Sequence, residues 1–361
     1  MRLLHVIYSG LGGQGEFLFP LIKNLKENSY YKHIIIFYGV EDLLIDYKNF
    51  CKENNIEFYY INSKKLFSSI NYISILKSHN PDIIFIHTSV ILKSIIFNCF
   101  KKTKLVFIDH TSNQVKRKND WINLFISCLF FEKIIFLAKF HKKEIQNNFF
   151  FNIFKSKFKL IKPGIFLKKE NSKNKKIKDK KRFFIKLGMA SRFAKGKNHI
   201  DLIYAFQKIQ NNNNLNIKLS LVGTGPEQNK IKNYLYKNKL HKYIKLEGLQ
   251  NNKNMKKWFK EIDVYVHWSK GEVVSRSILE AMQNQKIIFA SKILSTKEQL
   301  TDGYKCGILF KDEKDFVDKF NKYYSNNLKN ENLRLNCLKQ IKKNYNLNKF
   351  IKTFEYTIGK I

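Results

Sequence analysis

The stretch "DVYVHWSKGEVVSRSILEAMQ", residues 263–283, begins with the pattern of a strand and ends with that of a helix. Its first residues are mostly apolar and rich in β-branched and aromatic side chains, which predicts a buried strand ending near Trp268. Ser269 opens a loop, and an amphipathic helical segment follows. A strand followed by a helix is half of a βαβ unit, so this stretch favours a parallel sheet.

The same alternation runs along the whole chain. Further strands are predicted at residues 3–8, 33–38, 57–61, 82–87, 104–109 and 133–137, then at 183–190, 216–223, 243–248 and 286–291. Segments between them, such as 16–27, 41–53 and 67–79, have helical periodicity. Strands separated by helices form right-handed βαβ units, so we expect an α/β fold with two facing Rossmann-like domains and a cleft between them. Ligands of such sheets bind at the carboxyl ends of the strands.

A break in the alternation marks the domain boundary. Residues 160–182 contain Pro163-Gly164 and then a polar, lysine-dense run with almost nothing to bury. We therefore predict four segments along the chain: an N-terminal Rossmann-like, acceptor-side domain (1–165), a basic linker (166–182), a C-terminal Rossmann-like domain that binds the donor (183–345), and a C-terminal helix (346–361) that packs back on the first domain.

The charge of the chain favours anionic partners. The 361 residues include 67 Lys and Arg against 29 Asp and Glu, a formal net charge of +38, and 44% of the residues are hydrophobic. This excess favours nucleic acid, an acidic membrane surface or phosphorylated substrates. The alternative is that many lysines are solvated surface, because Lys, Asn, Ile and Phe are all abundant, as an AT-rich genome would produce.

Cysteine spacing and hydropathy exclude several classes of protein. The five cysteines form no C-x-x-C pair and no histidine pairing at metal spacing, which predicts reduced thiols and no zinc site. The N-terminal apolar run is too short for a signal peptide. The longest apolar stretch, 121–140, is broken by Glu132 and Lys133, so no membrane span is predicted. We expect a cytoplasmic protein that is soluble or peripheral on a membrane.

The first glycine-rich loop is ambiguous. "VIYSGLGGQGEF", residues 6–17, has Gly10, Gly12 and Gly15 in the spacing of a dinucleotide-binding loop. Such a site needs an acidic residue at the end of the second strand, where this chain has Tyr38 and Gly39. A glycine turn that allows tight strand–helix packing explains the loop as well as nicotinamide binding does. The exposed backbone N–H groups suit a phosphate from any source.

Two cations and a second glycine turn lie in the second half. Arg192 and Lys197 stand five residues apart on a loop before a helix, where they would clamp a diphosphate, although surface cations are the alternative. Residues 223–226, Gly-Thr-Gly-Pro, lie between a strand and a helix. Glycines there let a flat ring or a phosphate approach the backbone, and a tight turn capped by Pro226 is the alternative.

Two glutamates complete the pattern. Glu272 stands on the loop before a helix, and Glu280 lies about two turns into that helix on an otherwise apolar segment. A carboxylate in such a place costs free energy unless it accepts hydrogen bonds, for example from ribose hydroxyls. The alternative is that Glu280 pairs with a lysine or faces water.

Together these segments resemble the donor-binding half of glycosyltransferase family 4, retaining enzymes of GT-B fold. The resemblance covers most of residues 183–310, with motifs in family order: Gly188, Arg192 and Lys197-Asn198, then Gly223-Thr224-Gly225-Pro226-Glu227, Glu272 and Glu280-Ala281-Met282, and Glu298, Asp302-Gly303 and Gly307. The chain departs from the family at Val273, Gln285, Ile287, Ser295 and Thr296, where glycine or proline is usual, so the resemblance does not extend to the shape of the sugar pocket.

The resemblance implies roles for individual residues. Glu272 would hold hydroxyls of the donor sugar, Glu280 would hold the ribose, and Arg192 and Lys197 the diphosphate. His110 would lie near the reacting centre, although His87 ends a neighbouring predicted strand in a similar way. The remaining expected donor-binding residues are Gly12, Gly13, Gly223, Gly225, Gly248, Val274 and Ser275.

The function implied is transfer of a sugar, with retention, from a nucleotide-sugar, a UDP-sugar by default, to a glycan or lipid-linked acceptor in surface polysaccharide or glycoconjugate synthesis. No cofactor and no metal are expected, because the two cations would stabilise the leaving diphosphate and the chain has no Asp-x-Asp pair. The alternatives are a GT-B nucleotide-sugar epimerase or hydrolase, and a basic nucleic-acid-binding protein, although no RNA-binding motif is visible.

A membrane surface is a further expected partner. The lysine- and aromatic-rich segments 116–125 and 147–159 could rest on an anionic leaflet that holds a lipid-linked acceptor, on the inner face of the cytoplasmic membrane. The alternative is that the phenylalanines belong to the core, as apolar stripes at helical spacing usually do.

Overall fold

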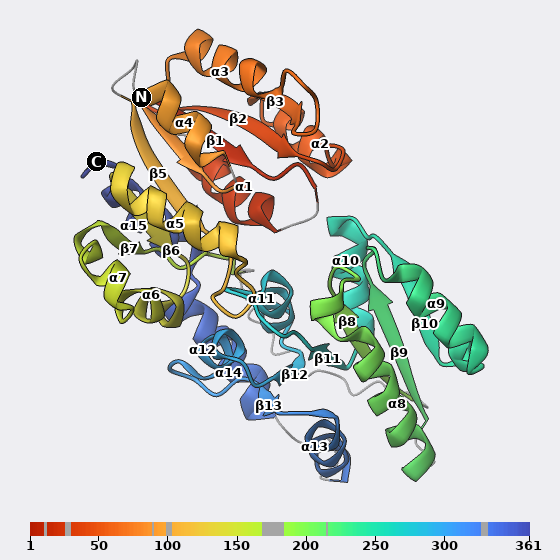
Figure 1. The fold of residues 1–361 in the computed structure, drawn as a ribbon. Coiled ribbons are helices and arrows are strands. Elements are labelled where there is room, and N and C mark those ends of the chain that lie inside the picture. Colours follow the sequence, from red (N-terminus) through yellow and green to blue (C-terminus); the bar gives the residue numbers. More distant parts are fainter. Residues whose placement is uncertain are drawn as a thin grey trace. The chain divides into compact units, whose positions relative to one another are not determined.

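The computed structural model divides the chain into two compact units. Unit 1 contains Met1–Gly164 and Tyr345–Ile361, and unit 2 contains Ile165–Asn344 (Figure 1). The structure describes all residues except 11–12, 26–29, 89, 99–102, 168–183, 214–215 and 326–330, and only the backbone of residues 16, 212, 213 and 252. Apart from Phe166 and Leu167, the predicted linker 166–182 therefore lies outside the described residues.

Unit 1 is built on one parallel sheet with the strand order β3-β2-β1-β4-β5-β6-β7. Its strands are β1 (Arg2–Ile7), β2 (Lys32–Gly39), β3 (Glu57–Asn62), β4 (Ile83–Ile86), β5 (Lys104–Asp109), β6 (Lys133–Phe136) and β7 (Phe158–Leu160). Its helices are α1 (Gln14–Leu25), α2 (Ile45–Glu53), α3 (Ser68–His79), α4 (Ile91–Asn98), α5 (Lys118–Phe130), α6 (Lys139–Gln146), α7 (Phe149–Asn152) and α15 (Leu347–Ile358). The central strands are almost wholly apolar because helices cover both faces of the sheet.

The two faces of this sheet are packed differently. One face, with Leu4 and Ile84, forms a core with apolar side chains of α3, α4 and α5. The other face receives α15, whose Phe354 ring lies 5.1 Å from that of Phe85 on β4. The Phe350 ring of α15 lies 5.0 Å from Phe17 of α1. The last helix of the chain is therefore part of the first sheet's packing.

Unit 2 has a second parallel sheet, with the strand order β10-β9-β8-β11-β12-β13. Its strands are β8 (Ile185–Ala190), β9 (Ile217–Val222), β10 (Ile244–Gly248), β11 (Val264–His267), β12 (Ile287–Ser291) and β13 (Ile308–Phe310). Its α-helices are α8 (His199–Asn213), α9 (Gln228–Lys237), α10 (Asn252–Glu261), α11 (Arg276–Gln283), α12 (Leu294–Thr301), α13 (Glu313–Ser325) and α14 (Glu331–Asn344). The predicted α/β fold with two Rossmann-like parallel sheets is confirmed.

The strand order of unit 2 has one reversal. From β8 the chain proceeds to β9 and β10 on one side, and then crosses to β11, β12 and β13 on the other side. The loops that leave the carboxyl ends of β8 and β11 thus diverge at a topological switch point, where open α/β sheets bind ligands.

Candidate active site

The loops after β8 and β11 meet through an ion pair between two of the predicted site residues. Lys197 ends a short 3₁₀ turn (Lys195–Lys197) after β8, and Glu272 lies on the loop before α11. The Nζ of Lys197 contacts Oε1 of Glu272, and their side chains are only 24% and 12% exposed. The sequence placed these residues 75 positions apart, and the switch point brings them into contact.

A histidine that the sequence analysis did not select is the second partner of this glutamate. His267, the last residue of β11, is buried, and its Nε2 lies 2.8 Å from Oε1 of Glu272. Its Nδ1 lies 3.4 Å from the hydroxyl of Tyr265 on the same strand. Because the carboxylate can only accept, Nε2 carries the proton and donates it.

The partners of Glu272 keep it ionised. Burial alone would raise the pKa of Glu272, but the charges of His267 and Lys197, and their hydrogen bonds, lower that pKa well below its usual range. The site therefore holds one fixed negative charge beside one ammonium group. Such a carboxylate can accept hydrogen bonds from ligand hydroxyls without a prior change in protonation.

Hydrogen bonds fix the loop that carries Glu272. The amide of Lys270 donates to the carbonyl of Gly196 at 2.9 Å, which ties this loop to the loop after β8. The amide of Ser269 donates to Oγ of Ser291 at 3.0 Å, and that hydroxyl donates back to the Ser269 carbonyl at 2.8 Å. The loops after three adjacent strands are thus held together.

Hydrogen bonds also fix the start of α11. Ser275 caps the helix, and its Oγ accepts from the amide of Ile278 at 3.3 Å. The buried side chain of Gln299 accepts from the amide of Ser275 at 2.8 Å and donates to its carbonyl at 3.0 Å. Val274 immediately precedes this cap. The N-terminus of α11, with its partial positive charge, therefore stands at the same edge of the sheet as Glu272.

Glu280 lies one turn beyond the start of α11 and is partly exposed. Its Oε1 lies 3.3 Å from Nε of Arg276, an ion pair between residues four apart on the helix. The sequence analysis gave a lysine or water as the alternative partner of Glu280. In the structure the partner is a cation, but it is Arg276 and not a lysine. Arg192, the other predicted diphosphate ligand, lies two residues after β8 and is half-buried.

The glycines of the Gly-Thr-Gly-Pro turn are required by the chain's own backbone. A Cβ at Gly223 would collide with the carbonyl oxygen of Ser191, and one at Gly225 would lie 2.5 Å from the carbonyl oxygen of Phe193. Both glycines have positive φ values, +136° and +155°. Hydrogen bonds of 2.9 Å link Phe193 to the carbonyl of Thr224 and to the amide of Glu227. These contacts favour the tight-turn interpretation.

Gly248 differs from these two glycines. It ends β10 with φ +68°, and, apart from its chain neighbours, no described residue has a heavy atom within 4 Å of the position a Cβ would occupy. Its need for glycine is conformational only, and the space beside it is open.

In unit 1, two of the predicted residues can be placed and one cannot. Gly12 lies outside the described residues, whereas Gly13 is exposed, with φ +76°, directly before α1. His110 follows β5, and its Nε2 lies 2.9 Å from Nδ1 of His87, so the two competing histidines are neighbours. Burial lowers the pKa of His110 to about 4, although Asp109 opposes this shift, so the ring is neutral near neutral pH.

A row of buried histidines leads away from His110 across the sheet. His87 is followed by His5 on β1, with ring centroids 6.2 Å apart, and Nε2 of His5 lies 3.2 Å from Nδ1 of His33 on β2. Burial lowers the pKa of His33 to about 4, and lowers those of His5 and His87 well below the usual value.

Next to His110, a buried ion pair shapes the loop. Nζ of Lys116 lies 2.9 Å from Oδ2 of Asp109, and both side chains are almost fully buried. The His141 Nε2 lies 2.9 Å from that ammonium. Oδ1 of Asp109 accepts from the amide of Thr111 at 3.1 Å, so the residues on both sides of His110 are fixed.

Packing accounts for Gly10 and Gly15 of the first glycine loop, whose residues 11 and 12 lie outside the described residues. A Cβ at Gly10 would collide with the carboxylate of Glu41, and one at Gly15 would lie 2.7 Å from the ring of Tyr47. The side chain of Gln14 accepts from the amide of Tyr8 and donates to the carbonyl of His87, both at 2.7 Å, which links the ends of β1 and β4. The packing interpretation of this loop is therefore supported.

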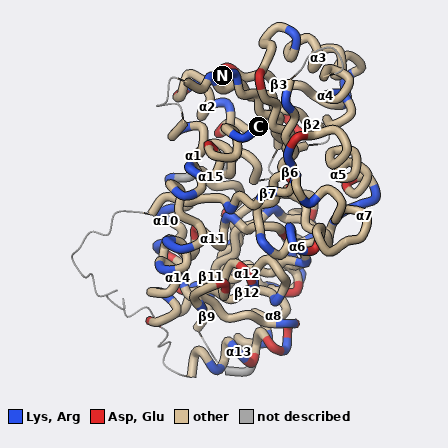
Figure 2. Tube along the Cα trace, turned by 90° about the vertical axis from the view of Figure 1, so that its left-hand side faces the viewer, with Lys and Arg blue, Asp and Glu red and all other residues tan. Residues whose placement is uncertain are grey.

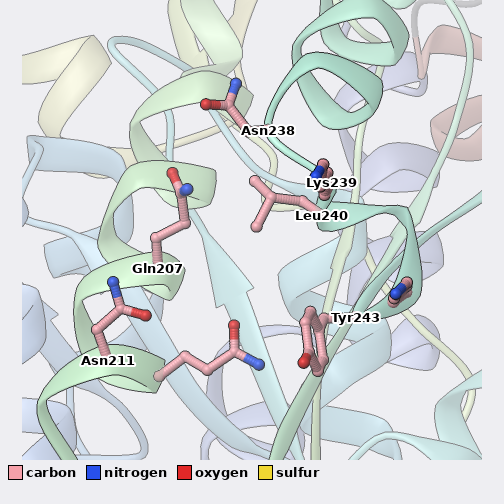
Figure 3. A pocket seen from close by; sticks show the side chains of 8 residues that line it. Gln207, Asn211, Asn238, Lys239, Leu240 and Tyr243 are labelled. Carbon is pink, nitrogen blue, oxygen red and sulfur yellow. The ribbon is translucent and has the colours of Figure 1, made fainter.

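A hollow of about 660 Å³ lies elsewhere on unit 2. It is lined by residues of α8 and of the connection from α9 to β10, including Gln207, Asn211, Lys239 and Tyr243 (Figure 3). These residues precede β9 and β10, so the hollow lies beside the amino ends of those strands, at the opposite edge of the sheet from the candidate site.

The two Rossmann-like units define the GT-B class of glycosyltransferase fold, and solved structures share it. The crystal structure of Anabaena Alr3699/HepE in complex with UDP and glucose matches with a TM-score of 0.81 and 16% identity over 100% of both chains. A glycosyltransferase from Rickettsia africae ESF-5 matches with a TM-score of 0.76 and 18% identity, over 99% of this chain and 97% of that chain.

Sequence comparison identifies the family. Residues 168–344 match the family model of the glycosyl transferases group 1. The uncharacterized glycosyltransferase MJ1069 of Methanocaldococcus jannaschii is 30% identical in an alignment of 273 positions that covers 71% of this chain and 68% of that relative. The chain therefore belongs to the group 1 glycosyltransferases, and the predicted resemblance to GT-B glycosyltransferases is confirmed.

Proposed function

We propose that this glycosyltransferase moves a sugar, with retention of anomeric configuration, from a UDP-sugar to a glycan or lipid-linked acceptor in surface polysaccharide or glycoconjugate synthesis. The observation that carries the proposal is the contact of Lys197 with Glu272 at the switch point of unit 2, beside the N-terminus of α11. The choice of UDP is supported by structurally similar HepE, whose crystals contain UDP-glucose in one case and UDP with glucose in another.

In this proposal the donor diphosphate replaces Glu272 as the partner of Lys197. Lys197, Arg192 and the first N–H groups of α11 would face the negative charge that grows on the leaving diphosphate, which is electrostatic stabilisation of the transition state. When the diphosphate binds Lys197, Glu272 keeps His267 as its partner and accepts from sugar hydroxyls with its free lone pairs. The two cations supply the charge that a divalent metal would otherwise provide, so we propose catalysis without a metal.

The other predicted residues have supporting roles in this proposal. Glu280 would accept from the ribose hydroxyls, while Arg276 keeps its charge balanced. The open space beside Gly248 and the fixed turn at Gly223 and Gly225 would receive the nucleotide. His110 is proposed as a residue that contacts the sugar, because its neutral ring can donate or accept a hydrogen bond.

A donor panel tests the proposal. Thermal unfolding is followed with UDP-, GDP-, ADP- and CMP-sugars, since a ligand at 100 times its Kd stabilises the folded state by about 2.7 kcal/mol. We expect UDP-sugars to stabilise the protein and Lys197→Ala to abolish the effect. Stabilisation by another nucleotide alone would replace UDP in the proposal. An inverted product anomer would reject retention, and acceptor-independent release of UDP would favour a hydrolase or an epimerase.

A further inference from the structure

An exposed apolar surface lies on unit 1, away from the residues proposed for catalysis. Phe149 and Phe150 of α7 and the nearby Ile153 are 87%, 70% and 76% exposed. Beside them, α5 exposes a row of large apolar side chains, which are Ile122, Phe125, Leu129 and Phe130. We call these seven residues the α5–α7 surface.

The members of this surface are held together by a buried layer beneath them. The ring of Phe125 lies 6.3 Å from that of Phe151 and 6.2 Å from that of Phe154, and Phe151 is buried. The Nζ of Lys157 donates to the carbonyls of Cys128 and Leu129 at the end of α5. The exposed phenylalanines therefore project from an anchored turn.

The sequence analysis gave, as an alternative, that these phenylalanines belong to the core. This is correct for only some of them. Phe151 and Phe158 are buried, whereas Phe149 and Phe150 point into solvent. The amide of Phe150 donates to the side chain of Asn148 at 3.1 Å, and this cap holds the turn that presents both rings. Contiguous exposed apolar residues of this kind mark an interaction site.

The charges around the α5–α7 surface select an anionic partner. Residues 116–159 contain ten Lys and Arg and three acidic residues; without Lys116, which is buried and paired with Asp109, nine basic residues remain and the net charge is +6 by subtraction. Each acidic side chain accepts a hydrogen bond within unit 1. Asp120 accepts from the amide of Arg117, Glu132 from the amide of Leu105, and Glu144 from the side chain of Asn113. Figure 2 shows Lys and Arg positions along this part of unit 1, and Lys118 and Lys155 are exposed.

We propose that the α5–α7 surface docks unit 1 on an anionic lipid bilayer, with Phe149, Phe150 and Ile153 in the boundary between headgroups and acyl chains. Apolar side chains flanked by lysines bind this boundary, because the lipid supplies both an apolar layer and negative headgroups. In the described part of the chain no helix could cross a bilayer, so attachment would be peripheral. The inference rests on the proposed function only in that a lipid-linked acceptor would lie in the same leaflet.

Sedimentation of the full chain with lipid vesicles tests the proposal. The vesicles contain phosphatidylcholine alone, or equal parts of phosphatidylcholine and phosphatidylglycerol. We expect binding to the anionic vesicles that weakens with salt. The variant Phe149→Ser/Phe150→Ser/Ile153→Ser should lose at least tenfold in partitioning. Lys118→Gln/Lys155→Gln should lose up to about 25-fold on anionic vesicles, since each basic residue near such a surface is worth about fivefold.

A matched control comes from another exposed apolar group of unit 1. Leu66, Phe67 and Ile70, at the start of α3, are also largely exposed, and their triple serine variant should bind vesicles like the unmodified protein. Equal binding by the α7 variant, loss of binding in the α3 variant instead, or equal affinity for pure phosphatidylcholine would overturn the proposal.

Two further measurements separate this proposal from its rivals. If the α7 variant changes the size of the protein in solution without lipid, the surface is a contact between protein copies and the membrane proposal is rejected. UDP-sugar stabilisation of the α7 variant reports on the proposed donor site, none of whose residues belongs to the α5–α7 surface. Loss of vesicle binding with that stabilisation intact supports the docking surface, and absent stabilisation in the unmodified protein rejects the proposed donor while leaving the vesicle result interpretable.

Discussion

Lys197 and Glu272 form a largely buried ion pair between the loops that leave two adjacent parallel strands of unit 2. Without a ligand, each of these two charged side chains is therefore stabilised by the other. Replacing one of them leaves a buried charge with fewer partners, which costs more than the pair itself contributes. The pair is accordingly the first target for mutation.

Lys197→Ala should lower kcat by about 100- to 1,000-fold, the effect of removing one preorganised group that stabilises transition-state charge. The matched control is Lys195→Ala, because Lys195 lies on the same 3₁₀ turn and is exposed. Steady-state release of UDP in the presence of acceptor measures both. Similar losses in the two variants would show that the turn, and not the ammonium at Glu272, is responsible.

His267 should act as a positioning residue for Glu272. His267→Phe removes a hydrogen bond to a charged group, worth about 1.5–3 kcal/mol, so kcat should fall at least about tenfold with a smaller change in KM. His267→Gln retains an N–H donor and should restore part of the activity. If Gln and Phe variants are equally impaired, the histidine has a packing role only.

His267→Phe should also raise the pH below which activity is lost. The folded-state pKa of Glu272 is depressed, so the stabilisation it provides is present above its ordinary pKa and is lost only as pH falls through the depressed value. Without His267 that folded-state pKa rises, and the loss begins at a higher pH. The acid limb of the kcat profile of His267→Phe should therefore shift upward, and an unshifted limb would contradict this.

The buried histidines of unit 1 predict acid sensitivity. Because burial lowers the pKa of His33, His110 and His141 to about 4, the unfolded chain binds more protons than the folded chain at intermediate pH. Stability should fall as pH decreases from about 6.5 toward about 4, and even one such histidine contributes about 1.4 kcal/mol per pH unit. His33→Leu should reduce this dependence in thermal unfolding, while the exposed His241→Gln should leave it unchanged.

Two glycines of unit 2 should respond differently to alanine. Gly223→Ala adds a collision with Ser191 to an unfavourable φ and should destabilise by about 3 kcal/mol or more. Gly248→Ala meets no atom of the other residues that the structure describes, and should cost about 1–2 kcal/mol from its positive φ alone. Urea unfolding of both variants checks the order, and a reversed order would contradict the backbone-contact argument.

The sequence predicted the central strands well because their apolar runs are long and wholly buried, as in β1 and β2. It missed β7 and β13, which have three residues each and sit at sheet edges. A three-residue run is too short to show a period. These strands form because a neighbouring strand is available for hydrogen bonding, which only the tertiary structure supplies.

The candidate site was predictable in part for a similar reason. Lys197 and Glu272 stand in motifs that resemble a known family, whereas His267 looks in sequence like any residue of a buried strand. Its partner lies five residues later, across a loop, and a histidine at the end of a strand facing a glutamate after the turn is the only signal that could have found it. For Gly223 and Gly225, sequence could not say whether a ligand or the backbone at residues 191–193 required the missing side chain.

The return of α15 to the first sheet affects how the protein matures during translation. The ring of Phe17 is covered by Phe350 and the ring of Phe85 by Phe354, so that side of unit 1 stays uncovered while the ribosome makes all of unit 2. A nascent chain released before α15 would have a complete second sheet and an incompletely covered first one. Dividing the gene between the two units would likewise require the α15 segment to be moved and joined to residue 164.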